Sequence, residues 1–215
     1  AGSSRTGDAA VDAIVDGVLA GDINGVRTEL RRLALLLGPK AFVTDVAAPL
    51  TSRVGELWER GAVEIRHEHL LTELLTTQLR LLMAAAEDLG ADRSVLLATP
   101  VGEQHGLGLE MVAVYLAYHQ VQPRLLGVSS PPDQIVDAAV ALRVDAVGLT
   151  VSAAADPKAA SSQIRDVVSS LPARVPCWVG GGGAGALDVR GTRRIQTWRE
   201  LDAAIQELRS SPGIA

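Results

Sequence analysis

The spacing of apolar residues changes abruptly near residue 90, and this change most constrains the fold. Before it, apolar residues recur every three or four positions over long segments, as in amphipathic helices. After it, short and almost continuously apolar runs alternate with amphipathic segments, which is typical of a parallel sheet covered by helices on both faces. The sequence therefore predicts an all-α domain over residues 8–90 and an α/β domain over residues 91–213.

The first domain is predicted to contain four helices separated by glycine-containing breaks. Either Asp22 or Asn24 can cap the second helix, since both side chains accept hydrogen bonds from a free helix terminus. Short connections between consecutive helices favour an up-and-down four-helix bundle. The expected helices span residues 8–19, about 22–37, 40–60 and 63–89.

The second domain is predicted to be a doubly wound parallel sheet. Ligands of such sheets bind at the carboxyl ends of the strands, so the loops there are the candidate site. Three of these loops stand out, over residues 100–108, 150–152 and 180–183. The expected strands are 94–100, 124–128, 146–151, 177–179 and one near 194–195, and the expected helices are 107–119, 132–142, 159–171 and 198–209.

Composition and charge exclude several classes of protein. With 47% hydrophobic residues, the 215-residue chain is neither disordered nor collagen-like. Acidic residues outnumber basic ones 25 to 20, which disfavours direct nucleic-acid binding, and no apolar run is long enough to span a membrane. The single cysteine, Cys177, cannot form an internal disulfide and lies in an apolar run. We therefore expect a buried thiol and a cytoplasmic protein.

The loop after the first expected strand contains an acid and a histidine two positions apart, Glu103 and His105. A neutral imidazole can bind a metal through one nitrogen while the other donates to a carboxylate. Alone the pair is a weak signal, and a structural or exposed histidine is the simpler interpretation. The glycines of 180–183 lack the Lys-Ser/Thr ending of a phosphate-binding loop and follow the fourth strand, so they do not favour a nucleotide site. They leave room for a large flat or elongated group.

Spacing connects these loops. Glu103-x-His105-x-x-Gly108 is followed by Thr150-Val-Ser152 and then by Gly180-Gly181. The series resembles the cobalamin-binding signature of methionine synthases and base-off mutases, which reads Asp-x-His-x-x-Gly, Ser-x-Leu and Gly-Gly on a flavodoxin-like domain. This chain departs from it in having Glu for Asp and Thr-Val-Ser in the middle.

The resemblance implies roles for these residues. His105 would be the lower axial ligand of cobalt, and Glu103 would hydrogen-bond it. The middle loop and Gly180-Gly181 would line the slot for the displaced dimethylbenzimidazole tail. Either Thr150 or Ser152 would supply the hydroxyl group.

The helical domain contains a second motif, Trp58 followed by nine residues and then Glu68-His69. Core packing of the tryptophan and a solvated Glu-His pair are the simple interpretations. However, the spacing resembles the upper-face motif of CarH-type cobalamin photoreceptors, which also have a four-helix bundle ahead of the cobalamin domain. The resemblance implies that Trp58 packs on the adenosyl group of adenosylcobalamin and that Glu68 and His69 help to hold it.

The same resemblance implies a non-enzymatic light sensor that forms a light-dependent homo-oligomer and signals to an unknown effector. The MerR-type DNA-binding domain of these repressors is absent from this sequence, so direct nucleic-acid binding is not expected. Several relatives have a cobalt-binding histidine directly after the tryptophan, where this chain has Glu59. A bis-histidine photoproduct would therefore need His67, His69 or another group to move in, or would not form.

Three alternatives remain open. The chain could be a corrinoid carrier protein of a methyltransferase system, which pairs a similar helical bundle with this domain. It could be a photoreceptor that also binds a bilin such as biliverdin, held noncovalently because no bilin-attaching cysteine motif is present. It could also be a doubly wound signalling domain that binds no cobalamin, which would leave the loop spacings without a reason.

Overall fold

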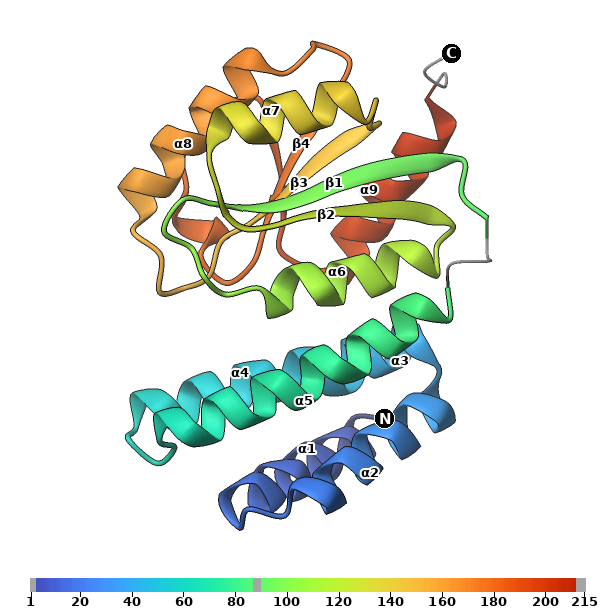
Figure 1. Ribbon diagram of the computed structural model, residues 1–215, viewed down its shortest axis with the longest axis vertical. Coiled ribbons are helices and arrows are strands. Elements are labelled where there is room, and N and C mark those ends of the chain that lie inside the picture. Colours follow the sequence, from blue (N-terminus) through green and yellow to red (C-terminus); the bar gives the residue numbers. More distant parts are fainter. Residues whose placement is uncertain (1–2, 87–89, 212–215) are drawn as a thin grey trace. The chain divides into compact units, whose positions relative to one another are not determined.

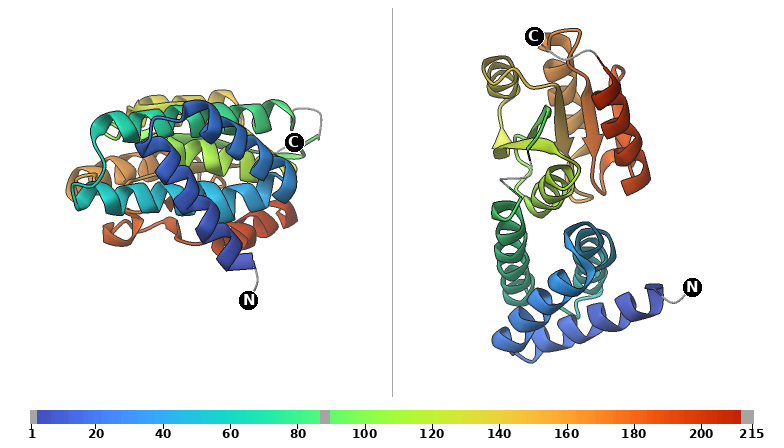
Figure 2. Two further views of the ribbon diagram at one scale, coloured as in Figure 1. Left: turned by 90° about the horizontal axis from the view of Figure 1, so that it is seen from below. Right: turned by 90° about the vertical axis from the view of Figure 1, so that its right-hand side faces the viewer.

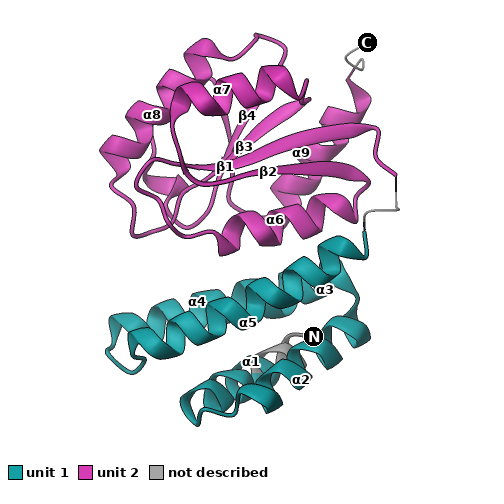
Figure 3. Ribbon diagram, viewed as in Figure 1, with its two compact units in different colours: residues 1–86 teal, residues 87–215 magenta. Residues whose placement is uncertain are grey.

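The computed structural model describes residues 3–86 and 90–211, with side chains from residue 9 onward. The chain divides into two compact units, residues 1–86 and residues 87–215 (Figure 3). The described part of unit 1 is helical, and that of unit 2 alternates strands and helices (Figure 1). This is the predicted fold class, an all-α bundle followed by a flavodoxin-like domain.

Unit 1 consists, over its described residues, of four helical runs. Of the two candidate caps, Asp22 is the one that caps the second helix, because its Oδ1 accepts a hydrogen bond from the Gly25 N–H at 2.9 Å. The runs pack through an aliphatic core that includes Ile14, Leu30 and Leu75. They are α1 (Ser3–Leu19), α2 (Ile23–Leu37), the continuous series α3 (Pro39–Phe42), η1 (Val43–Ala47) and α4 (Ala48–Glu59), and α5 (Ile65–Ala84).

The third run contains a π-helical segment, η1, that the sequence analysis did not foresee. Within it the Ala48 N–H donates to the Val43 carbonyl, five residues back instead of four. Pro49 follows directly and accounts for the wider turn, because it has no N–H and its ring would clash with the carbonyl of Asp45 in a regular helix. Pro49 was therefore the signal in the sequence for an irregular turn at this point.

The fourth helix is shorter than predicted. α5 ends at Ala84, whereas the prediction extended to residue 89, and residues 87–89 lie outside the described part. The Ala86 N–H donates to the Met83 carbonyl at 2.9 Å, three residues back. This tightening of the last turn is a common way for a helix to end.

The described residues of unit 2 form a five-stranded sheet in the order β2-β1-β3-β4-β5. Every neighbouring pair in this sheet is parallel. This is the flavodoxin-like order, in which ligands bind at the carboxyl ends of the strands where the order reverses, between β1 and β3. The strands are β1 (Arg93–Pro100), β2 (Val121–Ser130), β3 (Ala146–Thr150), β4 (Cys177–Gly180) and β5 (Thr192–Ile195).

Helices cover both faces of this sheet (Figure 2). One face packs on α7 and α8 through a core that includes Ile135, Ile164 and Leu149. On the other face α6 meets α9, where the rings of Tyr115 and Trp198 lie 4.8 Å apart. The helices are α6 (Leu107–Ala117), α7 (Pro132–Ala141), α8 (Pro157–Ser170) and α9 (Trp198–Ser210), and a short 3-10 turn, η3, spans Ala184–Ala186.

The edge strand β2 is longer than the predicted 124–128. Its pairing with β1 shifts register near Gly127, which has a φ of +112°, and again before Ser130. Such bulges interrupt the apolar pattern from which a strand is recognised.

Because all five strands are parallel, the loops that follow β1, β3 and β4 meet at one edge of the sheet.

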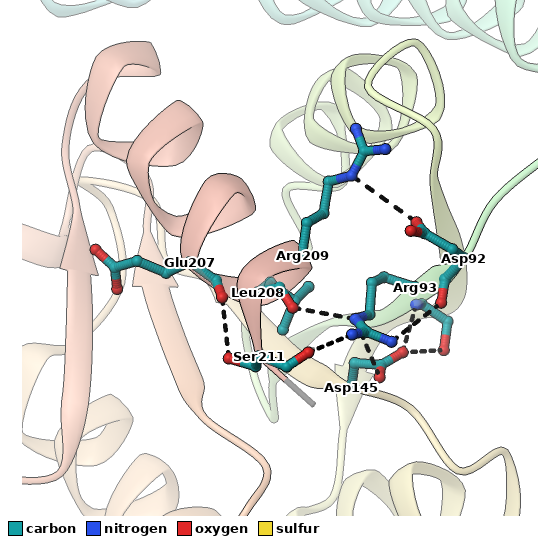
Figure 4. A network of polar contacts seen from close by, with 8 residues as sticks. Asp92, Arg93, Asp145, Glu207, Leu208, Arg209 and Ser211 are labelled. Atoms are coloured by element: carbon teal, nitrogen blue, oxygen red, sulfur yellow. Dashed lines mark hydrogen bonds and ion pairs between the residues drawn. The ribbon is translucent and has the colours of Figure 1, made fainter. Parts of the chain in front are cut away.

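A polar network ties the start of β1 to the end of α9 (Figure 4). Arg93 Nε donates to the Leu208 carbonyl at 3.0 Å, and its guanidinium also donates to the Ser211 carbonyl. Asp145 accepts a hydrogen bond from the Ser94 N–H at 2.7 Å and lies 3.9 Å from Arg93. The arginine thus satisfies carbonyl groups that the end of a helix leaves without partners.

Candidate functional site

The loop between β1 and α6 holds the acid and the histidine as one unit. Glu103 Oε1 lies 2.6 Å from His105 Nδ1 and also accepts a hydrogen bond from the His105 N–H at 2.9 Å. The Glu103 side chain is 4% exposed, whereas that of His105 is 64% exposed. A buried carboxylate therefore supports an imidazole that reaches into solvent.

The loop after β3 completes this unit through Ser152. The Ser152 N–H donates to Glu103 Oε2 at 2.8 Å, and Ser152 Oγ lies 3.3 Å from His105 Nδ1. Thr150 has a different position. Its methyl group packs against Gly108 so closely that a Cβ added there would lie 2.8 Å from Thr150 Cγ2. Of the two hydroxyl candidates, Ser152 is the one beside the acid–histidine pair, and Gly108 lets α6 approach β3.

Hydrogen bonding sets the charge of Glu103. Burial by itself raises the pKa of Glu103, but hydrogen bonds from Ser152 and His105 outweigh that effect and hold the pKa below its ordinary value. The group is therefore a carboxylate near neutral pH. Because this carboxylate can accept a hydrogen bond from His105 Nδ1, it favours the imidazole tautomer with the proton on Nδ1. That tautomer leaves the Nε2 lone pair free to bind a metal.

The glycines after β4 allow two loops to pack closely. A Cβ on Gly181, which has a φ of +95°, would lie 2.3 Å from the Val151 carbonyl oxygen, and one on Gly183 would lie 2.2 Å from that of Ser152. Hydrogen bonds join the same loops, from the Val151 N–H to the Gly180 carbonyl and from the Gly183 N–H to the Val151 carbonyl, both 2.9 Å. The glycines thus bring the β4 loop against the loop that carries Ser152.

The donor set fits a metal that brings most of its own ligands. In the described part of the chain, no group of three or more His, Cys, Asp or Glu side chains could hold a metal ion. One exposed imidazole, oriented from behind by a carboxylate, suits a metal whose other positions are filled by a macrocycle. His105 is the residue that would bind such a metal, and Glu103 and Ser152 would orient it.

The motif residues of unit 1 lie where residues 60–64 join α4 to α5. Trp58, in the last turn of α4, is 47% exposed and lines an open hollow with Gly61 and residues 63–66. On α5, Glu68 accepts a hydrogen bond from Thr72 Oγ1 at 2.9 Å, and its other oxygen lies 3.4 Å from His69 Nε2. The tryptophan is therefore not a core residue of the unit.

His67 has a structural role in unit 1. Its Nδ1 accepts a hydrogen bond from the Glu64 N–H at 3.2 Å, as part of a capping box at the start of α5. This bond occupies one of the ring nitrogens considered for cobalt after photolysis.

Three polar residues that belong to no sequence motif hold the His105 loop. They are Thr99, Ser129 and Gln163, on β1, β2 and α8. Each bonds to backbone groups of the loop over residues 101–103. Single polar residues at such distances along the chain carry no motif, so the sequence offered no signal for them.

The remaining conspicuous side chains of unit 2 are buried. Cys177 is 3% exposed and burial raises its pKa to about 12, which confirms the predicted core thiol. Trp178 is 4% exposed. A buried, protonated cysteine offers no attachment point for a bilin, in line with the expectation that any bilin would be noncovalent. The hypothesis of a noncovalent bilin gains no support. Over the residues described, none of the helices is long and apolar enough to cross a membrane.

The fold and this histidine–carboxylate unit together are those of a flavodoxin-like domain that presents an exposed imidazole beside the carboxyl ends of its strands. Residues 93–194 match the family described as B12 binding domain, and residues 10–83 match a second family with the same description. Both units thus match B12-binding domains, and these matches together with the site support cobalamin binding by this chain.

Two curated proteins of Myxococcus xanthus are similar to the chain. The HTH-type transcriptional repressor CarH is 37% identical over 152 residues, which cover 71% of this chain and 50% of CarH. The HTH-type transcriptional repressor CarA is 27% identical over 199 residues, which cover 91% of this chain and 66% of CarA. The chain thus spans about half to two thirds of the length of these relatives.

The fold is shared with a solved corrinoid protein. The monomethylamine corrinoid protein of Methanosarcina barkeri has a TM-score of 0.69 and 17% sequence identity, with 95% of this chain and 99% of that one covered. At this identity the likeness concerns the fold, and it agrees with the predicted pairing of a helical bundle with a flavodoxin-like sheet.

Proposed function

We propose that this chain is a light sensor that binds adenosylcobalamin with its own base displaced and with His105 as the lower axial cobalt ligand. The observation that carries the proposal is the Glu103–His105–Ser152 unit, in which a buried carboxylate orients an exposed imidazole. The similarity to CarH over 71% of this chain favours the adenosyl form of the cofactor.

The side chains of both units contribute to this function. Glu103 holds the His105 proton on Nδ1, so that Nε2 is available to cobalt. The glycine loop after β4 would accept the displaced tail beside Ser152. The half-exposed indole of Trp58 would cover the adenosyl group, with Glu68 and His69 beside it, because a rigid aromatic ring suits the flat face of a nucleoside.

Adenosylcobalamin, when bound, supplies a cobalt–carbon bond that visible light breaks. Without the adenosyl group, Trp58 would lose the contacts proposed for it, and the protein would then favour another arrangement. A ligand shifts such an equilibrium only through contacts that differ between the states. The resulting change in homo-oligomeric state is the proposed signal to an effector, and the chain acts as a switch and not as a catalyst.

Absorbance and sedimentation of the loaded protein, first in the dark and then in visible light, test this function. We expect illumination to change both the cobalamin spectrum and the sedimentation coefficient. The apo-protein, treated in the same way, should change in neither. A spectrum that responds to light while sedimentation stays constant would contradict the switch.

The second candidate is a corrinoid carrier of a methyltransferase system, which the fold match to a corrinoid protein keeps open. The two functions assign different roles to Trp58. A light sensor should bind adenosylcobalamin more tightly than methylcobalamin, and Trp58→Ala should abolish that preference. Tighter binding of methylcobalamin by the unmodified chain, with no effect of Trp58→Ala, would favour the carrier.

A further inference from the structure

Gln163, in the middle of α8, holds the start of the His105 loop with both of its polar atoms. Its Oε1 accepts a hydrogen bond from the Val101 N–H at 2.7 Å, and its Nε2 donates to the Val101 carbonyl at 3.1 Å. A neutral amide is suited to this pairing, because it presents one acceptor and one donor to a peptide group that presents the reverse. Gln163 contacts neither Glu103 nor His105 in any hydrogen bond found among the described residues.

The part of the loop that Gln163 holds has no apolar anchor of its own. The Val101 side chain is 47% exposed, so burial does not fix it. The next residue, Gly102, has a φ of +88° and open space where a Cβ would be. A glycine in open space lets the backbone pivot. Hydrogen bonding must therefore hold this segment in place.

Thr99 and Ser129 hold the same loop at Glu103. The Glu103 carbonyl accepts hydrogen bonds from Thr99 Oγ1 at 2.7 Å and from the Ser129 N–H at 3.2 Å. Ser129 Oγ accepts from the Gly102 N–H at 3.0 Å. The backbone on both sides of the Gly102 pivot is thus fixed, which leaves the Glu103 carboxylate to bond His105 and Ser152.

We propose that Gln163 is a positioning residue for the cobalt ligand: by fixing Val101, it holds the Glu103–His105–Ser152 unit in its binding geometry before the cofactor arrives. A loop that is already ordered loses less conformational entropy when the cofactor binds, which favours binding. The part of this inference that concerns cobalt rests on the proposed function. The part that concerns the geometry of the loop does not.

The first test is amide hydrogen exchange on the full-length apo-protein. Gln163→Met keeps a helix-forming residue of similar size and removes both hydrogen bonds to Val101. We expect the amides of His105 and Ser152, which bond to Glu103 and not to Gln163, to exchange roughly tenfold faster, in line with the loss of one or two hydrogen bonds. Acceleration confined to the Val101 amide would overturn the proposal.

A matched control and a second variant sharpen this test. Gln134→Met makes the same change on an exposed position of α7. Among the described residues, the Gln134 side chain bonds only its neighbour Asp133, at 3.4 Å, so this variant should alter none of these amides. Gln163→Glu keeps the size of the side chain, but its carboxylate cannot donate to the Val101 carbonyl, so it should also accelerate His105 and Ser152. Normal exchange in Gln163→Glu would contradict the need for the donor.

The second test is the absorbance spectrum of bound cobalamin, which distinguishes histidine-bound from histidine-free cobalt. We expect Gln163→Met to reduce the ratio of histidine-bound to histidine-free cofactor roughly tenfold relative to the unmodified protein and to Gln134→Met. If the unmodified protein takes up no cobalamin, the proposed function fails, and the exchange result alone decides the role of Gln163. If it binds through His105 and Gln163→Met gives the same spectrum, the inference fails while the proposed function stands.

Discussion

At the scale of single residues, the proposed ligand role of His105 depends on Glu103. Its side chain is almost fully buried, which disfavours the charge, yet its hydrogen bonds lower its pKa. The carboxylate is therefore maintained by the N–H groups around it and by the imidazole. An aspartate, as in the signature that this chain resembles, is one methylene shorter, so its carboxylate would sit further from His105 Nδ1 if the loop kept its course.

Glu103→Gln should weaken cobalt binding by His105 about 10- to 100-fold. The amide keeps the size of the carboxylate but carries no charge. Its NH₂ group would face the backbone N–H of His105 or Ser152, which in the unmodified protein donates to a Glu103 oxygen, so two donors would meet. Titration of the apo-protein with cobalamin, followed by absorbance, measures the change. Asp137→Asn, on an exposed position of α7, serves as the control, and equal affinities for all three proteins would contradict this role.

The sequence predicted which side chains gather at the edge of the sheet better than it predicted their contacts. Glu103, His105 and Ser152 were found because parallel strands bring their loops to one edge. The choice between Thr150 and Ser152 needed the structure, since Thr150 ends β3, Ser152 lies two residues further on, and only contacts separate them. Gln163 could not be predicted, because its partners are backbone atoms far away in the sequence.

At the scale of elements, the loop after β4 depends on glycine at particular positions. Gly181→Ala should lower the free energy of unfolding by about 2 kcal/mol or more, because the residue has a positive φ and its new Cβ would lie 2.3 Å from the Val151 oxygen. Gly182→Ala meets ordinary contacts at 3.5 Å and should change stability by about 0.5 kcal/mol or less. Urea unfolding compares the two, and similar losses would show that the close packing of these loops is not what requires Gly181.

The contact between α6 and α9 should make stability sensitive to high pH. Burial and a 2.8 Å hydrogen bond to Asp202 raise the pKa of Tyr115 from 10.0 to about 12. Between these values the unfolded chain has lost the proton that the folded chain keeps, so the free energy of unfolding falls as pH rises through this range.

Tyr115→Phe removes that dependence. Near pH 8 the variant should be about 1 kcal/mol less stable than the unmodified protein, because it lacks the hydrogen bond to Asp202. This difference in the free energy of unfolding should shrink toward pH 11. Urea unfolding at both pH values provides the measurement. A difference that stays constant or grows with pH would show that Tyr115 is not the titrating group.

The helices and strands were largely predictable because their apolar periodicities are long and regular. The exceptions have local physical causes. Pro49 produces a π-helical segment within a predicted α-helix, and the last turn of α5 tightens at Ala86. In β2, bulges near Gly127 mask the carboxyl end of the strand.

At the scale of the whole molecule, the proposed function requires both units. Unit 2 carries the histidine, its supporting carboxylate and the glycine loop, whereas unit 1 carries the exposed Trp58 and the Glu68–His69 pair. The change of periodicity near residue 90 therefore separates a unit proposed to hold the cofactor from one proposed to sense its upper ligand. The binding of cobalt by His105 is the claim on which all the others depend.

Electron paramagnetic resonance of bound cob(II)alamin tests that claim most directly. Protein uniformly labelled with nitrogen-15 is loaded with unlabelled cofactor, so the superhyperfine splitting of the cobalt signal identifies the source of its axial nitrogen. We predict the doublet of nitrogen-15 for the labelled protein, and loss of that doublet in labelled His105→Ala. The triplet of unlabelled nitrogen in the labelled protein would show that the cofactor keeps its own base, and would contradict the account.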